Sequence, residues 1–286
     1  SMPETSTTIK SGSIVSPELP IEFINTGELD IKTTYVLPVT IKSVEGIGVL
    51  QSAKTYYYVF RGASLINVVC NISRNRAYPD FKNDSKFNNL TENTMEILFK
   101  ANSFPNTLNT LMGIESNYLL RIGDATIPNN QLQVATSVNN CTSADLQLES
   151  GKWYHVAVAF NKGNVKVYIN GVEKLSGSTG KSSVSLGAKH TNEEDGSRCF
   201  WVGYSYKDDR YFDGVVSEVR IWNRALTAEE IQATNHFYTI EPESEGLIAY
   251  WKFDEGSGTV AKVYSVSGYD LTIEKEPKWE SVSLPQ

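Results

Sequence analysis

The sequence predicts an all-β protein, built mainly as a sandwich of two antiparallel sheets. Residues 153–160 are apolar or aromatic at nearly every position, residues 165–169 alternate between apolar and other side chains, and Asn170-Gly171 follows. A continuous apolar run is typical of a central strand covered on both faces, and alternation is typical of a strand buried on one face. Asn-Gly supplies the two φ > 0 residues of a tight hairpin turn. We therefore expect the two runs to be adjacent antiparallel strands.

The composition favours a globular β protein and excludes some partners. The 286 residues are 40% hydrophobic and 11% aromatic, which suits a sizeable core built from sheets. There are 26 Lys and Arg against 33 Asp and Glu, a formal net charge of −7. An acidic chain without a basic stripe is a poor candidate for nucleic acid or anionic membranes. No apolar run reaches the roughly 18 residues that a membrane-spanning segment needs.

The amino-terminal part, residues 1–64, is expected to form a small Ig-like β-sandwich that acts as a spacer or a binding domain. Residues 1–8 are polar and are expected to fray. Pro38 cannot donate a ladder hydrogen bond, so its strand is expected at an edge or to carry a bulge. Strand signals separated by turn residues lie at 8–10, 13–15, 19–24, 34–41 and 54–60.

The larger sandwich is expected to span residues 65–286, after a joint at Arg61-Gly-Ala-Ser64. A short helix is predicted near its end, because Thr227 as N-cap and Glu230 form a capping box. Further strand signals lie at 65–70, 87–90, 93–100, 111–114, 118–123, 131–135, 200–203 and 214–222. In the run 93–100, Met95, Ile97 and Phe99 fall on one face.

Four motifs carry a family resemblance. They are Gly-Lys-Trp-Tyr-His-Val-Ala at 151–157, Tyr-Ile-Asn-Gly at 168–171, Phe-Trp-Val-Gly at 200–203, and the run from Asp213 to Ile231. In this order they resemble the laminin G-like, concanavalin A-like group of β-sandwiches, over roughly residues 70–286. The resemblance implies a jelly roll of two antiparallel sheets that usually binds glycans or proteins, sometimes with calcium.

The amino-terminal part carries a second resemblance. Residues 35–43, together with 55–59, are similar to a domain of unknown function in exported Bacteroidetes lipoproteins, where it often precedes a laminin G-like or glycan-active domain. This implies an exported protein at the bacterial outer-membrane surface or in the periplasm. Ser1 before Met2 is typical of a cloning remnant, which leaves room for an export signal and a lipid anchor ahead of the printed sequence.

The tail, residues 246–286, opens with a run that resembles the first motif of laminin G-like domains. Either a second such domain is cut short, or the strand order is permuted and the tail completes the same sandwich. Because about 40 residues cannot bury a core of their own, we favour the second interpretation. The residues expected to pack against the first sandwich are Leu247, Ala249, Trp251 and Phe253.

No catalytic residues are predicted, and we expect no enzyme. A retaining glycosidase on this architecture needs two carboxylates about 5 Å apart, often presented as Glu-x-Asp-x-x-Glu on one strand, and that pattern does not occur. The chain also has no Gly-x-Ser-x-Gly elbow and no His-Glu-x-x-His motif. His155 is expected as a buried, hydrogen-bonded core residue.

Carbohydrate binding is predicted from two groups of side chains. Sugars need flat aromatic faces ringed by acids, amides and Arg, and the loop 203–213 offers that mixture. The same aromatic residues equally suit packing over the edge of the sandwich. The predicted contact residues are Tyr206, Asp208, Asp209, Arg210 and Tyr211, with a second group formed by Tyr118 and Arg121 beside Asn117 and Asp124.

Calcium is the expected ion, with Asp254 and Asp270 as candidate ligands in turn-like segments. Acidic residues are also simply common in turns, so this interpretation competes with an ordinary solvated loop. The three cysteines are too few for a disulfide framework. One bridge, from Cys141 to Cys199, is compatible with the sequence, and so are buried thiols.

The sequence as a whole predicts a monomeric, non-catalytic surface protein that captures glycans for uptake or degradation. Two alternatives stay open. The chain is compatible with the accessory binding portion of a glycoside hydrolase, and with a protein-interaction or adhesion module. Fold alone does not choose among them.

Overall fold

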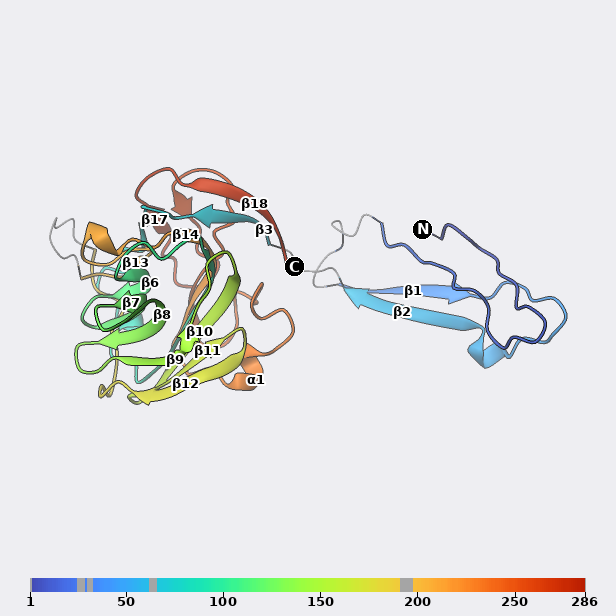
Figure 1. Ribbon diagram of the computed structural model, residues 1–286, viewed down its shortest axis with the longest axis horizontal. Helices are drawn as coiled ribbons and strands as arrows, with labels where there is room; N and C mark the ends of the chain where they lie inside the picture. The colour runs from blue at the N-terminus through green and yellow to red at the C-terminus, as the bar shows by residue number, and fades with distance from the viewer. Residues whose placement is uncertain (1, 25–28, 30–32, 62–65, 191–197, 286) are drawn as a thin grey trace. The chain divides into compact units, whose positions relative to one another are not determined.

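The computed structural model describes residues 2–24, 29, 33–61, 66–190 and 198–285 (Figure 1). The chain forms two compact units, Ser1–Ser64 and Leu65–Gln286. Residues 62–64 of the predicted joint lie outside the described part of the chain. No helix among the described residues is long and apolar enough to cross a membrane.

The smaller unit has one two-stranded antiparallel sheet in its described residues. Strand β1 (Thr34–Thr40) pairs with β2 (Thr55–Arg61), and a short 3-10 helix, η2 (Gln51–Ala53), precedes β2. Pro38 lies opposite Tyr57. Because both strands of such a sheet are edges, Pro38 occupies an edge strand, as predicted.

The small Ig-like sandwich predicted for residues 1–64 is not what the described residues form. The segments 8–10, 13–15 and 19–24 are not strands. Pro17 and Pro20 have no backbone donor to give to a neighbouring strand. Most of the side chains are also exposed, Ile14 to 95%, so little burial of apolar surface offsets the entropy lost in ordering a strand.

The larger unit is a sandwich of two antiparallel sheets, which confirms the predicted all-β fold class (Figure 1). In spatial order, the first sheet runs β12 (Val172–Ser178), β11 (Asn164–Ile169), β10 (Trp153–Asn161), β5 (Glu92–Ala101), β14 (Gly214–Trp222), β3 (Ile66–Asn71) and β18 (Lys278–Leu284). Strand β15 (Leu247–Trp251) also joins this sheet, by pairing with β14.

The second sheet faces the first across the core. The runs 111–114, 118–123 and 131–135, which were predicted as strands, lie in this sheet, whereas the strand at 141–147 was not predicted. In spatial order, this sheet runs β16 (Val260–Ala261), β17 (Leu271–Ile273), β4 (Ala77–Tyr78), β13 (Trp201–Val202), β6 (Asn109–Ile114), β7 (Tyr118–Asp124), β8 (Ile127–Thr136) and β9 (Cys141–Gln147). Two 3-10 helices, η3 (Ser85–Phe87) and η4 (Asp208–Arg210), lie in its loops.

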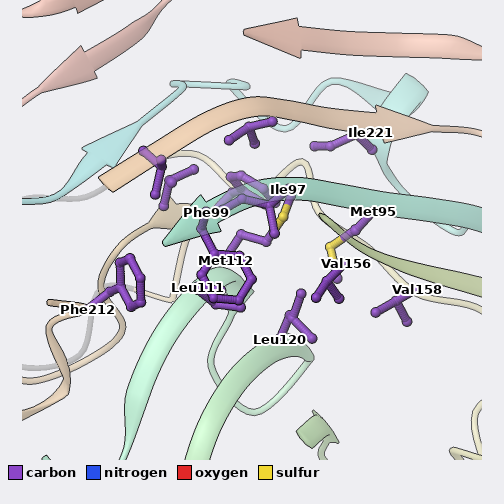
Figure 2. Packing of buried hydrophobic residues seen from close by; sticks show 14 of the residues in the cluster. Met95, Ile97, Phe99, Leu111, Met112, Leu120, Val156, Val158, Phe212 and Ile221 are labelled. Atoms are coloured by element: carbon purple, nitrogen blue, oxygen red, sulfur yellow. The ribbon is translucent and has the colours of Figure 1, made fainter. Parts of the chain in front are cut away.

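The core between the sheets follows from alternation along the strands. Met95, Ile97 and Phe99 of β5 are fully buried on one face, as predicted, and lie near Val156 of β10 and Leu120 of β7 (Figure 2). Successive residues of a strand point to opposite faces, so the side chains of Met95, Ile97 and Phe99 all lie in the layer between the two sheets.

The outer face of the first sheet is also covered. The helix α1 (Ala228–Ile231) and the residues after it pack there, which is why the run 155–160 of β10 is buried on both faces, as predicted. The capping box forms as expected, because Thr227 Oγ1 accepts a hydrogen bond from Glu230 N (3.3 Å) and Glu230 Oε2 accepts one from Thr227 N (2.9 Å). The buried side chains of this layer are Ala157, Ala159, Tyr168, Trp222, Leu226, Ile231, Leu247 and Tyr250.

The hairpins differ from the prediction in one detail. Strands β10 and β11 pair antiparallel, as expected. Asn170 (φ 48°) and Gly171 (φ 77°) do form a tight turn, but it joins β11 to β12, a strand that was not predicted. Most side chains of β12 are exposed, and its sequence, Val-Glu-Lys-Leu-Ser-Gly-Ser, has no alternation of apolar and polar residues from which a strand could be predicted.

The tail, residues 246–286, contributes to both sheets. Strand β15 pairs with β14, β18 pairs with β3, and β17 pairs with β4. Trp251 is fully buried, and its indole Nε1 donates to Tyr269 O (2.8 Å). The tail therefore supplies strands and core residues to the sandwich that begins near residue 66.

The cysteines are not bridged. Cys70, Cys141 and Cys199 are all buried and form no disulfide. Cys141 Sγ donates to Ser178 O (3.3 Å), and Cys199 Sγ lies 3.2 Å from Nδ1 of His190. The pairing of Cys141 with Cys199 is therefore absent, and these thiols act as small buried side chains.

Candidate functional site

A surface depression of about 430 Å³ lies at one end of the second sheet. Three separate segments form it: the loop ahead of β6, the turn between β7 and β8, and η4. Its lining residues are Pro105, Asn106, Thr107, Leu108, Asp124, Ala125, Asp209 and Arg210. The depression thus joins parts of the two groups of residues that the sequence suggested separately.

Three asparagines hold the first wall, the loop ahead of β6, in place. Asn109 Nδ2 donates to Asn106 O (3.0 Å), which closes the loop on the start of β6. Asn106 Nδ2 donates to Tyr211 O (3.0 Å), which ties this loop to the residues after η4. Asn129 Nδ2 donates to Phe104 O (2.7 Å) from the neighbouring strand β8. The walls are therefore linked by side-chain amides.

Gly123 permits the close approach of the β7–β8 turn to the first wall. Its φ is +82°, and a Cβ at this position would lie 2.4 Å from Thr107 O. Both the backbone conformation and the missing side chain are therefore required here.

Replacing Gly123 by alanine is expected to destabilise the larger unit. A side chain at positive φ costs about 1–3 kcal/mol, and the clash with Thr107 O adds about 1–3 kcal/mol. Urea unfolding measures the sum. The matched control is Gly151→Ala, because Gly151 also has a positive φ (+77°) but has no atom within 4 Å of the added Cβ. Equal losses in the two variants would contradict the proposed clash.

The second wall is organised by Arg121. Its Nε donates to Gln133 Oε1 (2.8 Å), and its Nη2 donates to Asp124 Oδ2. Asp124 Oδ1 accepts from Ala125 N (2.7 Å). Arg121 is only 8% exposed, so it orients Asp124 beside the depression and is not itself a lining residue.

The third wall carries the charged residues of η4. Arg210 Nη1 lies 2.9 Å from Glu115 Oε2, and this ion pair holds the guanidinium beside the depression. Asp209 Oδ1 lies 4.0 Å from Arg210 Nε, while the Asp209 side chain stays 78% exposed. Asp208 is exposed as well but does not line the depression.

The aromatic residues of the loop 203–213 lie beside the depression and do not line it. Tyr206 is half-buried at φ 62°, and its ring has three cations within 6 Å of its centroid: Arg210 at 5.4 Å, Lys207 at 5.6 Å and Arg198 at 5.8 Å. Its π face is therefore already used by the protein's own side chains.

Tyr211 packs inward. Its ring centroid lies 5.0 Å from that of Tyr204, within a cluster that contains buried Trp201. Burial raises the pKa of the Tyr211 hydroxyl to about 12, although the nearby Arg76 charge opposes this rise. Tyr211 thus supports the loop by packing, while its carbonyl receives the Asn106 amide.

Tyr118 is a correction to the predicted site. It begins β7 on the inward face, is fully buried, and its ring lies 5.8 Å from that of Phe160. Burial raises the pKa of its hydroxyl. The sequence placed Tyr118 beside Arg121, but three positions along a strand bring the two side chains to opposite faces.

Asn106 and its neighbours are the functional candidates that the sequence did not reveal. Residues 101–110 were interpreted only as a loop, although loops on a rigid scaffold are common binding surfaces. The one available signal was the mixture of Pro, Asn and Leu at 105–108 next to a strand.

The predicted calcium ligands are engaged within the protein. Asp270 accepts from Lys262 Nζ (2.8 Å) and Val263 N (2.9 Å), and Asp254 accepts from the Tyr264 hydroxyl (3.3 Å). Burial raises the pKa of Glu255 beside them, and both aspartates add to this rise. Within the described ranges, neither aspartate belongs to a group of three close ligand atoms, so calcium stays a prediction.

Comparison with known families gives two matches. A model of the concanavalin A-like lectin/glucanases superfamily matches residues 75–232. A model of an N-terminal domain matches residues 1–48. None of the curated proteins compared with the chain is significantly similar to it.

Several solved structures are similar to the chain. One is a protein from Bacteroides ovatus ATCC 8483, described as a candidate carbohydrate-binding protein, with 26% identity and a TM-score of 0.69 over 89% of this chain and 70% of that one. A heptameric pentraxin from Limulus polyphemus has 14% identity and a TM-score of 0.42 over 60% and 82% of the two chains. Domain 4 of an extracellular arabinanase from Geobacillus stearothermophilus, in complex with arabinotriose, has 19% identity and a TM-score of 0.41 over 75% and 91%. The last two likenesses are too weak to bear on function.

Proposed function

Because the chain belongs to the concanavalin A-like lectin/glucanases superfamily, we propose that its larger unit binds carbohydrate, without cleaving it, at the depression between the three loops. One observation carries the proposal: acidic, amide and guanidinium groups from distant parts of the sequence converge on the depression, which Pro105, Leu108 and Ala125 also line. Sites that bind small ligands place a few polar groups within a lining that includes apolar side chains. The similarity to the Bacteroides ovatus protein supports the same substrate class.

The groups around the depression suit sugar hydroxyls. Asp209 offers carboxylate oxygens as acceptors, and Arg210 offers N–H donors. Pro105 and Leu108 supply apolar surface for the C–H face of a ring. Because the walls are tied together by amide hydrogen bonds, little ordering entropy is lost when a ligand binds.

The arrangement favours binding over cleavage. Glycoside hydrolysis canonically uses a pair of carboxyl groups flanking the scissile bond. Of the carboxylates that line the depression, Asp124 has both oxygens engaged, one by Arg121 and one by Ala125 N. That leaves Asp209, which faces solvent, without a second carboxylate to work with.

A cellular role follows as part of the same proposal. We propose that the protein is exported and captures glycans at the bacterial surface, with the smaller unit as a spacer. The match of residues 1–48 to an N-terminal domain and the Bacteroides relative support this setting.

Replacing Asp209 by alanine is expected to weaken glycan binding by about tenfold or more, because a hydrogen bond to a charged group contributes roughly 1.5–3 kcal/mol. A glycan array identifies a ligand, and calorimetric titration then compares the variants. Asp208→Ala is the matched control, since Asp208 is an exposed neighbour outside the depression.

Three results would overturn the proposal. They are failure of the wild-type protein to bind any glycan, equal losses in the two aspartate variants, and release of shorter sugars from the bound oligosaccharide. The first would favour a protein-interaction module, the second would move the site elsewhere, and the third would make the protein an enzyme.

A further inference from the structure

A second group of chemically capable side chains lies on the outer face of the first sheet. Glu96 comes from β5, His155 from β10, and His236 from the segment after α1. Their side chains are 0%, 0% and 4% exposed. One carboxylate oxygen and one nitrogen from each imidazole lie within 4.8 Å of one another.

The two oxygens of Glu96 have separate surroundings. Oε2 accepts a hydrogen bond from Trp222 Nε1 (2.6 Å) and lies 3.7 Å from Arg220 Nη1. Oε1 faces the imidazoles, at 2.6 Å from Nε2 of His236 and 3.4 Å from Nε2 of His155. One oxygen is therefore fixed by partners in the sheet, and the other points to two nitrogens that can coordinate an ion.

His155 has unused coordinating capacity. Among the described residues its Nδ1 has no partner, and its Nε2 makes no well-formed hydrogen bond, although both atoms are buried. Its ring is stacked on Phe237 with centroids 4.5 Å apart, which fixes its direction. The neutral imidazole is the form that binds metals. An unsatisfied buried polar group is costly and needs an explanation.

We propose that Glu96, His155 and His236 bind one divalent transition-metal ion of the zinc class. Two imidazoles and one carboxylate are a ligand set that zinc uses in proteins. Calcium takes six to eight oxygen ligands and does not suit this group. The ion would connect β5 and β10 to the segment that carries His236, and so fasten that segment to the sheet.

The charges near the ion are compatible with this site. Arg220 is paired with Glu218, and Tyr250 also donates to Glu218 (2.6 Å), so the guanidinium has a counter-charge of its own besides Glu96.

The residues around the three ligands also hold them in place. Trp222 orients the carboxylate, and Arg220 Nη1 donates to His236 O (2.7 Å), which holds the backbone of the third ligand. Such hydrogen bonds fix the direction of side chains that bind a metal. Without an ion, the same atoms form a hydrogen bond between His236 Nε2 and Glu96 Oε1, so the metal replaces a shared proton.

Metal content after refolding tests the site. Tag-free full-length protein is refolded from denaturant with Zn²⁺, dialysed, and analysed by elemental mass spectrometry, because the buried site fills most easily during folding. We expect about one zinc per chain. His236→Gln and Glu96→Gln are expected to lose at least about 100-fold in zinc affinity, the upper end of what loss of an outer-shell partner costs. Refolding with Ca²⁺ is expected to leave no calcium at this site.

His190→Gln is the matched control, because His190 lies beside a cysteine thiol elsewhere in the sandwich. It is expected to retain zinc at the wild-type level. The proposal is overturned if the wild-type protein retains no zinc, or if His236→Gln and Glu96→Gln retain as much as the wild type. In either case the three residues form only a hydrogen-bond network. Circular dichroism checks that each variant is folded, and His236→Gln is the decisive variant because its residue lies in the covering segment and not in a central strand.

Discussion

Replacing Arg220 by methionine is expected to lower the free energy of unfolding by about 3–5 kcal/mol, the usual cost of removing one partner from a buried ion pair. Arg220 is fully buried, bonds to Glu218, and donates to His236 O (2.7 Å). Methionine fills similar space but leaves Glu218 without its counter-charge. Urea unfolding in the presence of a chelator measures the loss without interference from metal.

The loss is expected to depend on pH. Burial already raises the pKa of Glu218, and the Arg220 charge opposes that rise. Without Arg220 the folded pKa rises further, while the unfolded chain keeps its ordinary value of about 4.3. The folded state then holds a proton that the unfolded state releases, so stability falls as pH increases. The loss should be larger at about pH 8 than at about pH 5.

Arg224→Met is the control for this prediction. Arg224 pairs with Glu230 at 2.6 Å, but its side chain is 32% exposed, and such surface pairs contribute only about 0–1 kcal/mol. The double variant Glu218→Gln with Arg220→Met should recover part of the loss, because no unpaired carboxylate remains at position 218. Losses of the same size for Arg220→Met and Arg224→Met would show that burial of the Arg220 pair does not matter.

Removing residues 246–286 is expected to abolish cooperative unfolding of the larger unit. The deletion takes away β15 beside β14 and β18 beside β3, and it removes Trp251 from the core. Loss of a buried tryptophan side chain alone costs about 3–5 kcal/mol, which is a large part of the stability of a typical domain. Near-ultraviolet circular dichroism during thermal unfolding measures the effect.

Removing residues 1–64 is the matched control, because those residues form a separate compact unit. The remaining chain should keep its cooperative transition. If the chain without 246–286 unfolded cooperatively at the wild-type midpoint, the tail would have to be an appendage, and the pairing of β15 and β18 would not contribute to stability.

Local sequence patterns were enough to predict much of the fold. The apolar run 153–160 indicated a strand covered on both faces, and the capping residues Thr227 and Glu230 indicated the start of α1. These predictions succeeded because the sequence pattern behind each of them lies within one turn or one strand. The sandwich predicted for the smaller unit did not form, because a local pattern is not enough for a strand. Residues 8–24 have a strand-like composition, but among the described residues they have no neighbouring strand to pair with.

The two candidate sites depend on contacts between segments that are distant in the sequence. Asp209 and Arg210 were recognised from their loop, whereas their position in one depression with Asp124 and Asn106 depends on how β6, β7 and η4 come together. The buried group of Glu96, His155 and His236 was not recognised, because its members lie on three segments far apart in the chain.

The sequence by itself determined that the chain forms β-strands, which side chains alternate along them, and where the short helix begins, because these depend on residues a few positions apart. Only the tertiary structure decided that Tyr118 points into the core, that Asp124 and Asp209 line the same depression, and that two histidines lie beside Glu96. The physical reason is that pairing between distant strands sets which face of each strand is covered. That pairing is specified by the whole sandwich and not by any one segment.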